Sequence, residues 1–382
     1  MVPCSVYFVE CGFPEDLPGF NRDTPAASFP YWGQYSALDF AIAAFSALGT
    51  DSCRIVAEPR FRGIISFINA RPRTESEQLS IIDSGIDGLL DLIEKDPAET
   101  VLFSPLHLLC DPDADALRQA VSALTSPSIQ RISIRKVETD IYLASKRTLI
   151  EAVKSYRRKH PLSHNLGTAL FTELLHASFE SIRDIPGRIL FQNNLTQLFK
   201  ENLRLVGENG KAELLERLKS PAKTGGSAKG ALIDRCGHVR NSLIAAGTRI
   251  EGYVEGSFIF PGVVVHRGAS VVNSVVMNGN RIGSKARLYK TLVLPYVGEL
   301  GTSNVGESAS IGMIEAGARN FDFPKQIREG VTVIGMNVEI PKGMKIGSGS
   351  LVGARVGAAQ LRSIKELPRS STVRGNQDQD QE

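Results

Sequence analysis

The chain has 382 residues, of which 42% are hydrophobic and 22% are charged, and this mixture excludes an intrinsically disordered protein. The 44 lysines and arginines nearly balance the 41 acidic residues. The resulting net charge of +3 gives no reason to expect nucleic acid or an anionic membrane as a partner. The length predicts two or three domains.

Membrane insertion and secretion are also disfavoured. No segment approaches the roughly 18 apolar residues that a membrane-spanning helix needs, and the first 20 residues lack the basic flank and apolar stretch of a signal peptide. The five cysteines lack the spacing of a zinc site or a disulfide framework, so we expect free, buried thiols in a soluble cytoplasmic protein. They are Cys4, Cys11, Cys53, Cys110 and Cys236.

The first half of the chain alternates strand-like apolar runs with helical patterns. Strands are expected at 5–9, 53–57, 100–104, 129–134 and 140–144. Helices are expected at 36–48, around 89–93, from a cap at Asp111 and Pro112 to about 124, from the cap Ser145 to 159, at 166–177 and at 195–206. This alternation is typical of an α/β domain on a mainly parallel sheet, here residues 1–206.

Residues 207–230 have the composition of a linker. The stretch contains the turn pair Asn209-Gly210, then a short helical pattern at 211–218, and then the run Gly225-Gly226-Ser227. We therefore expect this stretch to connect two domains.

The second half is a repeat with a period of six residues. Aliphatic residues recur every sixth position, glycine often follows directly, and a small residue stands four positions later. The spacing holds within five runs: Ile244 and Ile250; Ile259, Val265 and Val271; Val276, Ile282 and Leu288; Val305 and Ile311; and Ile334, Ile340, Ile346 and Val352. This hexapeptide pattern predicts a parallel β-helix over 231–360, with loops near 295–304 and 315–330. A sandwich of short strands would alternate with period two instead. The remaining residues, 361–382, form a tail that we expect to be disordered at its end.

Four segments resemble the bacterial glucose-1-phosphate adenylyltransferase (ADP-glucose pyrophosphorylase) family: 30–40, 185–205, 240–257 and 271–277. The resemblance implies a Rossmann-like nucleotidyltransferase domain followed by a left-handed β-helix. It also implies a reaction that transfers an adenylyl group from ATP to glucose 1-phosphate, giving ADP-glucose for glycogen synthesis. Such chemistry needs backbone donors and a basic side chain for the phosphates, and carboxylates for magnesium.

The sequence departs from this family at the positions that carry the chemistry. Where the family has a glycine-rich loop after the first strand, residues 10–20 contain only two glycines among prolines and acids. Thr24 stands at a family lysine position, and Leu106 and Phe191 stand at the positions of two magnesium-binding aspartates. The nucleotidyltransferase domain is therefore expected to be degenerate, with no catalytic residue, metal or cofactor. Magnesium and ATP are expected only if the chain is active.

Three functional hypotheses remain open. We favour a regulatory or scaffolding subunit, in a homo- or hetero-oligomer with an active glucose-1-phosphate adenylyltransferase subunit, because the family usually forms tetramers and includes a degenerate paralogue of this kind. The alternatives are an active adenylyltransferase with substitute residues, and an enzyme similar to hexapeptide acyltransferases with His266 as general base. We expect no nucleic-acid or membrane partner.

Two residues are candidates for contacts to a sugar phosphate or a nucleotide. Gln34 stands where the family has a basic residue, and His107 follows an expected strand end. Trp32 stands at a family glycine position, where its ring would fill space that a nucleotide needs. The basic run 157–160 ends an expected helix, where cations interact favourably with the helix dipole. We favour that explanation over an effector site.

Overall fold

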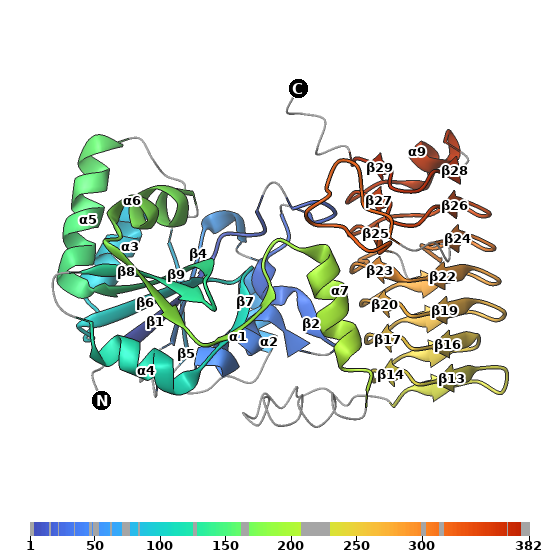
Figure 1. Cartoon of the computed structure of the whole chain (residues 1–382), viewed down its shortest axis with the longest axis horizontal. Helices are drawn as coiled ribbons and strands as arrows, with labels where there is room; N and C mark the ends of the chain where they lie inside the picture. Colours follow the sequence, from blue (N-terminus) through green and yellow to red (C-terminus); the bar gives the residue numbers. More distant parts are fainter. Residues whose placement is uncertain are drawn as a thin grey trace.

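The computed structural model describes residues 4–14, 17–21, 23–33, 35–45, 48, 53–61, 63–70, 77–82, 85–124, 128–161, 168–207, 230–298, 303–312, 317–364 and 366–375. An α/β domain lies beside a stack of short strands (Figure 1). Among the helices of these residues, none is both long and apolar enough to cross a membrane.

A seven-stranded sheet forms the centre of the first domain, with the order β10-β8-β9-β6-β1-β4-β5. Its strands are β1 (Cys4–Glu10), β4 (Cys53–Ala57), β5 (Glu77–Ile81), β6 (Thr100–Pro105), β8 (Ile129–Ile134), β9 (Val137–Ser145) and β10 (Ser181–Ile185). β9 is antiparallel to both neighbours, and all other neighbouring pairs are parallel. Every residue of β1 and β6 is buried, as continuous apolar runs covered on both faces predict.

Helices cover both faces of this sheet. The helices are α1 (Ala37–Phe45), α2 (Ile64–Ala70), α3 (Ile86–Glu94), α4 (Ala114–Ser122), α5 (Lys146–Lys159), α6 (His176–Ser178) and α7 (Leu195–Arg204), with a π-helix, η4 (Thr168–Leu175), before α6. α3, α5 and η4 pack on one face, whereas α1 and α4 pack on the other. α3 and α5 lie above the sheet in Figure 1, and α4 lies below it.

Helix caps confirm one prediction and correct another. The Ser145 side chain accepts a hydrogen bond from the Thr148 amide and begins α5, as predicted. The cap of α4 is Asp113, which accepts from the Ala116 amide, and not Asp111. Asp111 belongs to β7 (Leu109–Pro112), which pairs antiparallel with β11 (Gly187–Phe191), a long-range contact that local capping rules do not reveal.

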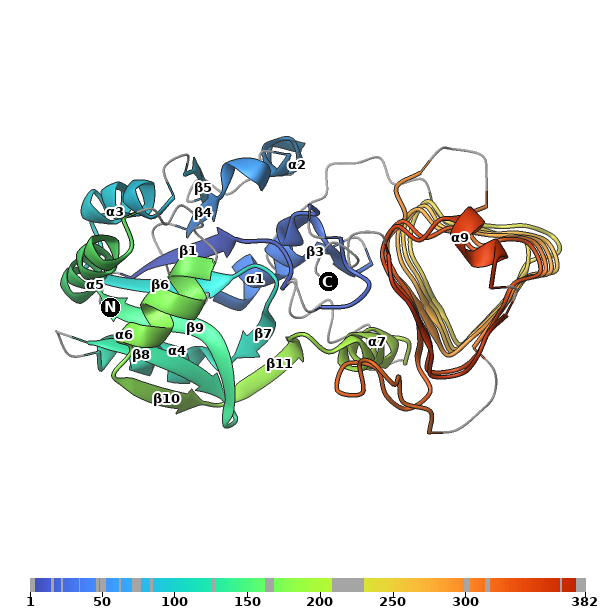
Figure 2. The same cartoon turned by 90° about the horizontal axis from the view of Figure 1, so that it is seen from above.

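The second domain is a left-handed parallel β-helix with three sheets. The first sheet contains β12 (Leu232–Ile233), β15 (Arg249–Ile250), β18 (Val264–Val265) and β21 (Arg281–Ile282). The second contains β13 (His238–Arg240), β16 (Tyr253–Glu255), β19 (Ser270–Val272), β22 (Arg287–Tyr289), β24 (Ser310–Ile311), β26 (Lys345–Ile346) and β28 (Glu366–Leu367). The third contains β14 (Leu243–Ile244), β17 (Phe258–Ile259), β20 (Val275–Val276), β23 (Thr291–Val293), β25 (Thr332–Ile334), β27 (Leu351–Val352) and β29 (Thr372–Val373). Seen from above, the coils have a triangular outline (Figure 2).

The six-residue pattern predicts the core of the β-helix correctly. Thirteen of the fourteen aliphatic residues are buried in one cluster, and Ile244 in the first coil packs against it half-buried. The register explains this burial, because Ile259 pairs with Val276, which pairs with Val293, so that equivalent side chains stack in columns. The small residues at the corners, such as Ala269 and Ala286, are also buried.

The predicted end of the β-helix at residue 360 is too early. After the short helix α9 (Ala358–Arg362), β28 and β29 pair with β26 and β27 and add strands to the stack. The polar composition after residue 361 concealed them, since each strand has only two residues and one buried aliphatic side chain. Most of the predicted linker, 208–229, and the predicted disordered end, 376–382, lie outside the described residues.

The two domains share an apolar core. The third β-helix sheet points alternate side chains towards the first domain, and Phe258, Val275, Leu292 and Val333 belong to the same buried cluster as α1 and α7. α7 lies along this sheet (Figure 1). The Thr196 amide at its start donates to the Gln326 carbonyl at 3.0 Å. The α/β domain and the β-helix are therefore packed together.

The cysteines are free, as predicted, but they are not all buried. Cys4, Cys53 and Cys110 are buried and Cys11 is half-buried, whereas Cys236 is exposed on the first β-helix coil. The expectation of uniformly buried thiols is therefore wrong for Cys236.

Candidate functional site

The candidate site lies at the carboxyl edge of the seven-stranded sheet. β1 lies between β4 and β6 and is parallel to both, so the loops that follow these three strands start at the same edge. Ligands of open α/β sheets bind outside the carboxyl ends of the strands, where the strand order reverses. The loop after β1, Glu58 after β4, and Leu106 with His107 after β6 all begin here.

Glu10, the last residue of β1, is a buried carboxylate in this region. Its Oε1 accepts hydrogen bonds from the amides of Gly12 at 2.8 Å and Ala26 at 3.0 Å, and its Oε2 accepts one from the Ala27 amide at 2.7 Å. Burial raises the pKa of Glu10 to about 7, against the opposing effect of the three amide donors and of Arg60. Three amides of the segment after β1 are thus bound to the side chain of Glu10.

The rest of the loop after β1 forms a small aromatic cluster. The ring centroids of Phe13 and Phe20 lie 4.2 Å apart, and Phe29 lies 5.4 Å from Phe13 and 5.2 Å from Phe20. Phe20 also stacks on Phe191 at 6.0 Å. All four rings are buried. These side chains form apolar core and supply no hydrogen-bond donors.

The two positions at which the resemblance places magnesium-binding aspartates are apolar and buried. Leu106 and Phe191 are 0% and 1% exposed and belong to the core that the two domains share. Thr24, at the family lysine position, is half-buried, and its amide donates to the Asn21 carbonyl. Within the described part of the chain, no three His, Cys, Asp or Glu side chains are grouped to hold a metal ion. The residues present do not fit magnesium.

His107 lies at the sheet edge, as predicted, beside the loop after β1. Its Nδ1 is 3.1 Å from the Gly12 carbonyl oxygen and 3.6 Å from the Cys11 sulfur. Burial, together with the charges of Glu10 and Glu58, raises the pKa of the Cys11 thiol well above its ordinary value. A raised pKa disfavours the thiolate that a nucleophilic cysteine needs. Whether His107 contacts a ligand stays a prediction.

Gln34, the other ligand-binding candidate, lies outside the described residues. Its neighbour Gly33 has a φ of +69°, and a side chain there would meet the Phe258 ring of the β-helix at 3.2 Å. Trp32 is fully buried and stacks on Tyr31 at a centroid distance of 5.3 Å. In the hairpin of β2 (Pro30–Trp32) and β3 (Tyr35–Ser36), the aromatic side chains of β2 lie in the core, whereas Tyr35 of β3 is half-buried.

His266 points outward from the coil, as predicted. Its Nδ1 lies 3.5 Å from Oε2 of Glu251, and the other oxygen of Glu251 pairs with Arg249 at 2.6 Å. The imidazole side chain is 31% exposed. Its role as a general base stays an untested alternative.

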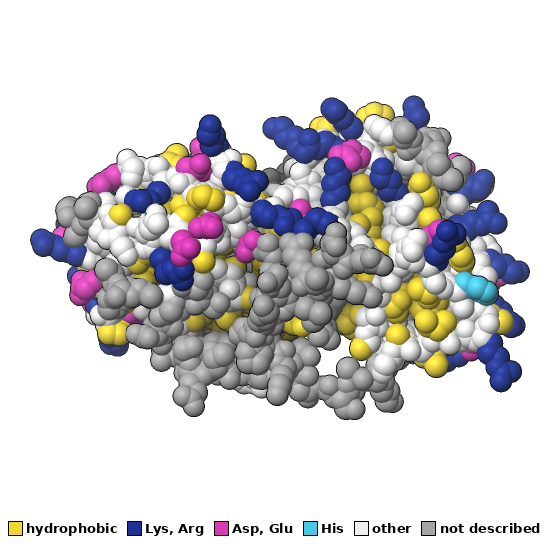
Figure 3. Space-filling view, turned by 60° about the horizontal axis from the view of Figure 1, so that its bottom comes forward, with side chains coloured by type: hydrophobic (Ala, Val, Ile, Leu, Met, Phe, Trp, Pro, Cys, Tyr) yellow, Lys and Arg dark blue, Asp and Glu magenta, His cyan; other side chains and the backbone are white. Residues whose placement is uncertain are grey.

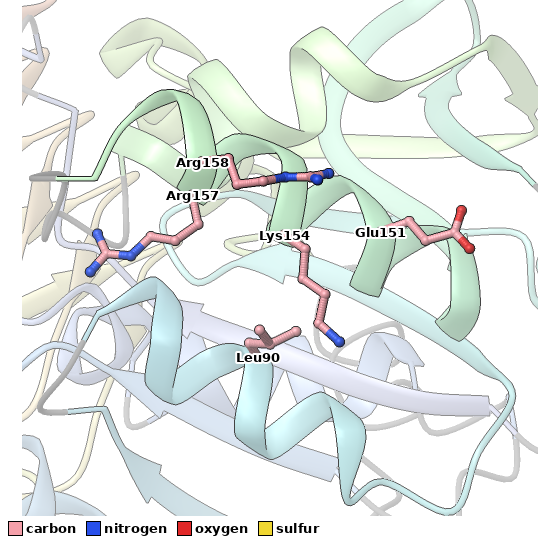
Figure 4. A pocket seen from close by; sticks show the side chains of 5 residues that line it. All are labelled: Leu90, Glu151, Lys154, Arg157 and Arg158. Carbon is pink, nitrogen blue, oxygen red and sulfur yellow. The ribbon is translucent and has the colours of Figure 1, made fainter.

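A surface pocket lies between α3 and α5 and includes part of the basic run 157–160. Leu90, Glu151, Lys154, Arg157 and Arg158 line it (Figure 4). Two of its cations are paired with α3, because Lys154 lies 2.8 Å from Glu94 and Arg157 lies 2.7 Å from Asp87. These ion pairs join the two helices. Arg157, Arg158 and Lys159 lie in the last turn of α5, as the helix-dipole explanation requires, and an effector site stays an untested alternative.

A second pocket lies in the 317–324 loop of the β-helix, beside the turn before β29. It is lined by Gly317, Ala318, Arg319, Asn320, Phe321, Pro324, Arg369 and Ser370. Phe321 is 77% exposed. The sequence pattern showed only that a loop leaves the coil here. Lys and Arg side chains are spread over both domains in Figure 3, with Asp and Glu among them, consistent with the low net charge.

Comparison with known proteins agrees with this architecture. A family model described as the GlmU-like C-terminal hexapeptide matches residues 220–316. A glucose-1-phosphate adenylyltransferase of Acetivibrio thermocellus is 30% identical over 141 residues, and one of Desulfitobacterium hafniense is 25% identical over 221 residues. The chain is therefore similar to glucose-1-phosphate adenylyltransferases. A third such protein, from Bacillus cytotoxicus, is 43% identical over 63 residues, 16% of this chain and 17% of that protein.

The similarity to this family is partial. The match to the Acetivibrio thermocellus protein covers 37% of this chain and 32% of that protein, and the match to the Desulfitobacterium hafniense protein covers 54% and 48%. The chain thus spans about half the length or less of the curated glucose-1-phosphate adenylyltransferases that it matches. This partial similarity does not by itself assign their activity to this chain.

Proposed function

We propose that this chain is a catalytically silent member of the glucose-1-phosphate adenylyltransferase family that regulates or scaffolds an active subunit in ADP-glucose synthesis. Adenylyl transfer needs donors for the phosphates and carboxylates for magnesium. The observation that carries the proposal is the burial of Phe191, stacked on Phe20, at a position where the resemblance places one of the carboxylates. Neither a metal nor ATP is part of the proposed role.

The β-helix and its contact with the first domain could support the binding of a partner subunit. The β-helix has a continuous core and a wide outer surface, and the first domain is packed against one of its sheets. A chain that has lost catalytic groups but keeps this architecture can still contribute surface to an assembly. The proposed partner is an active glucose-1-phosphate adenylyltransferase chain, in a mixed oligomer.

The test has two stages. The purified chain is first assayed alone for ADP-glucose formation from ATP, glucose 1-phosphate and magnesium. It is then mixed with an active subunit from the same cell, and complex mass, rate and effector response are compared with a mixture that contains an unrelated β-helix protein. We expect no turnover alone, together with a mixed complex whose rate or effector response differs from that of the active subunit. Magnesium-dependent turnover alone would favour the active alternative, and failure to form a complex would contradict the subunit role.

A further inference from the structure

The carboxylate of Glu10 closes the loop that follows β1. Its three amide donors come from the two ends of this loop, Gly12 at the start, and Ala26 and Ala27 at the end. Glu10 has no exposed surface. A carboxylate that is removed from water is stable only when hydrogen bonds replace its hydration, so the three amides and the carboxylate depend on one another.

The middle of the same loop contacts the β-helix. The Gly19 carbonyl accepts a hydrogen bond from the Met336 amide at 2.8 Å, and Asp23 pairs with Arg355 at 3.2 Å. Gly19 has a φ of +84°, and a β-carbon there would lie 3.5 Å from the Gly335 backbone. The loop is thus held by Glu10 at its base and by the β-helix at its tip.

We propose that Glu10 is an internal anion. Its carboxylate occupies the amides that an external carboxylate or phosphate would otherwise bind, and it fixes the loop in the conformation that packs against the β-helix. Converging backbone N–H groups at the carboxyl edge of a parallel sheet bind anions in general. Here the acceptor belongs to the chain, so Glu10 itself fills the cradle. Glu10 is a positioning residue, and this role does not depend on any partner subunit.

The proposal is tested by removing the internal anion and supplying an external one. Glu10→Ala deletes the carboxylate, and sodium formate is the probe, with sodium chloride at the same ionic strength as its control. Measurements are made at about pH 8, where the wild-type carboxylate is ionised. The readouts are the thermal midpoint and amide hydrogen exchange of the 331–337 peptide, which contains the Met336 amide, relative to a peptide from β9.

Asp96→Ala is the matched control. Asp96 is also buried and accepts hydrogen bonds from side chains and from the Ala98 amide, but it contacts Ser5, Tyr7 and Arg54. These contacts lie away from the loop after β1. The control separates a local opening of the loop from a general loss of stability.

For Glu10→Ala we expect exchange of the Met336 amide within the 331–337 peptide to accelerate about tenfold or more relative to β9, because the loop that carries its acceptor, the Gly19 carbonyl, is no longer closed by Glu10. Formate, but not chloride, is expected to restore slow exchange and to raise the thermal midpoint by mass action. Asp96→Ala is expected to change both peptides alike. Unchanged exchange in Glu10→Ala, or recovery that chloride reproduces equally, would overturn the proposal.

Glu10→Gln keeps the test decisive if the alanine variant does not fold. The amide has the volume of the carboxylate, so Oε1 can still accept from Gly12 and Ala26, but an NH2 group then faces the Ala27 amide. We expect faster exchange of the 331–337 peptide that formate does not reverse, because the glutamine fills the cradle. Wild-type exchange in this variant would show that the negative charge is not needed and would refute the internal anion.

Discussion

Phe191 and Leu106 are the two residues at which the resemblance places magnesium-binding aspartates, and both are apolar and buried. Both are enclosed by the core that joins the two domains, and Phe20 stacks directly on Phe191. An aspartate introduced at either position would be buried without donors, and an unpaired buried charge is strongly unfavourable. The apolar character of the site is therefore maintained by its surroundings as well as by the two residues.

Phe191→Asp is predicted to destabilise the protein without producing activity. The expected loss in the free energy of unfolding is about 4 kcal/mol or more, since a ring is lost and a charge is buried. Phe191→Leu, which stays apolar, is expected to lose less than half of that. Urea unfolding of both variants measures the difference. A stable Phe191→Asp variant that binds magnesium would show that the site is still open to the metal.

The stability contribution of Glu10 is predicted to depend on pH. Burial raises its pKa from 4.5 to about 7 in the folded protein, so the folded state binds this proton more tightly than the unfolded state does. The contribution to the free energy of unfolding is therefore greatest below about pH 4.5 and is lost as the pH rises to about 7. The neighbouring ionisable side chains are the same in wild type and in Glu10→Gln. The difference in unfolding free energy between the two proteins therefore reports on Glu10.

Urea titrations at a series of pH values test this dependence. The free energy of unfolding of wild type minus that of Glu10→Gln is expected to fall across pH 4.5 to 7 and to be level above that range. A difference that stays constant, or that rises with pH, would mean that Glu10 titrates normally.

At the scale of elements, the β-helix could be predicted from the sequence because its rule is local. Each coil repeats the same six-residue pattern, so the burial of Ile259 and Val276 follows from it. Val293, which stacks on Val276, was not among the predicted positions. Elements that depend on distant partners were missed. β7 and β11 form only because they pair with each other. Since Asp111 belongs to β7, the residue that caps α4 is Asp113 and not Asp111.

Two adjacent valines in β19 test which side chains of this strand point into the β-helix core and which point outward. Val271→Ala removes a fully buried side chain and is expected to cost about 2 kcal/mol of unfolding free energy. Val272→Ala, on the outer face of the same strand, is expected to change it by about 0.5 kcal/mol or less. Chemical denaturation of the pair provides the measurement. Equal losses would contradict the register of the coil.

At the scale of the whole molecule, the shared core was the least predictable feature. The sequence predicts two domains and the inward aliphatic positions of the β-helix, but it gives no partner for Phe258, Val275 and Leu292. Their burial depends on the loop after β1 and on α7, which come from the other domain. Glu10 was likewise unremarkable in the sequence, because its amide donors Ala26 and Ala27 approach only when the loop closes.

The shared core predicts that the two domains unfold together. Leu292→Asp, which places a charge in that core, is expected to split a single thermal transition into two, with the β-helix melting second. Arg287→Asp, on the exposed face of β22, is expected to leave one transition. Calorimetry distinguishes the two results. Two transitions in the wild type would show that the interface does not couple the domains.

The most direct test of the central claim is ADP-glucose formation by the purified chain alone, supplied with ATP, glucose 1-phosphate and magnesium. The filled site predicts no turnover above a reaction without protein. Magnesium-dependent turnover that follows the chain through purification would contradict the proposal that its catalytic site is silent.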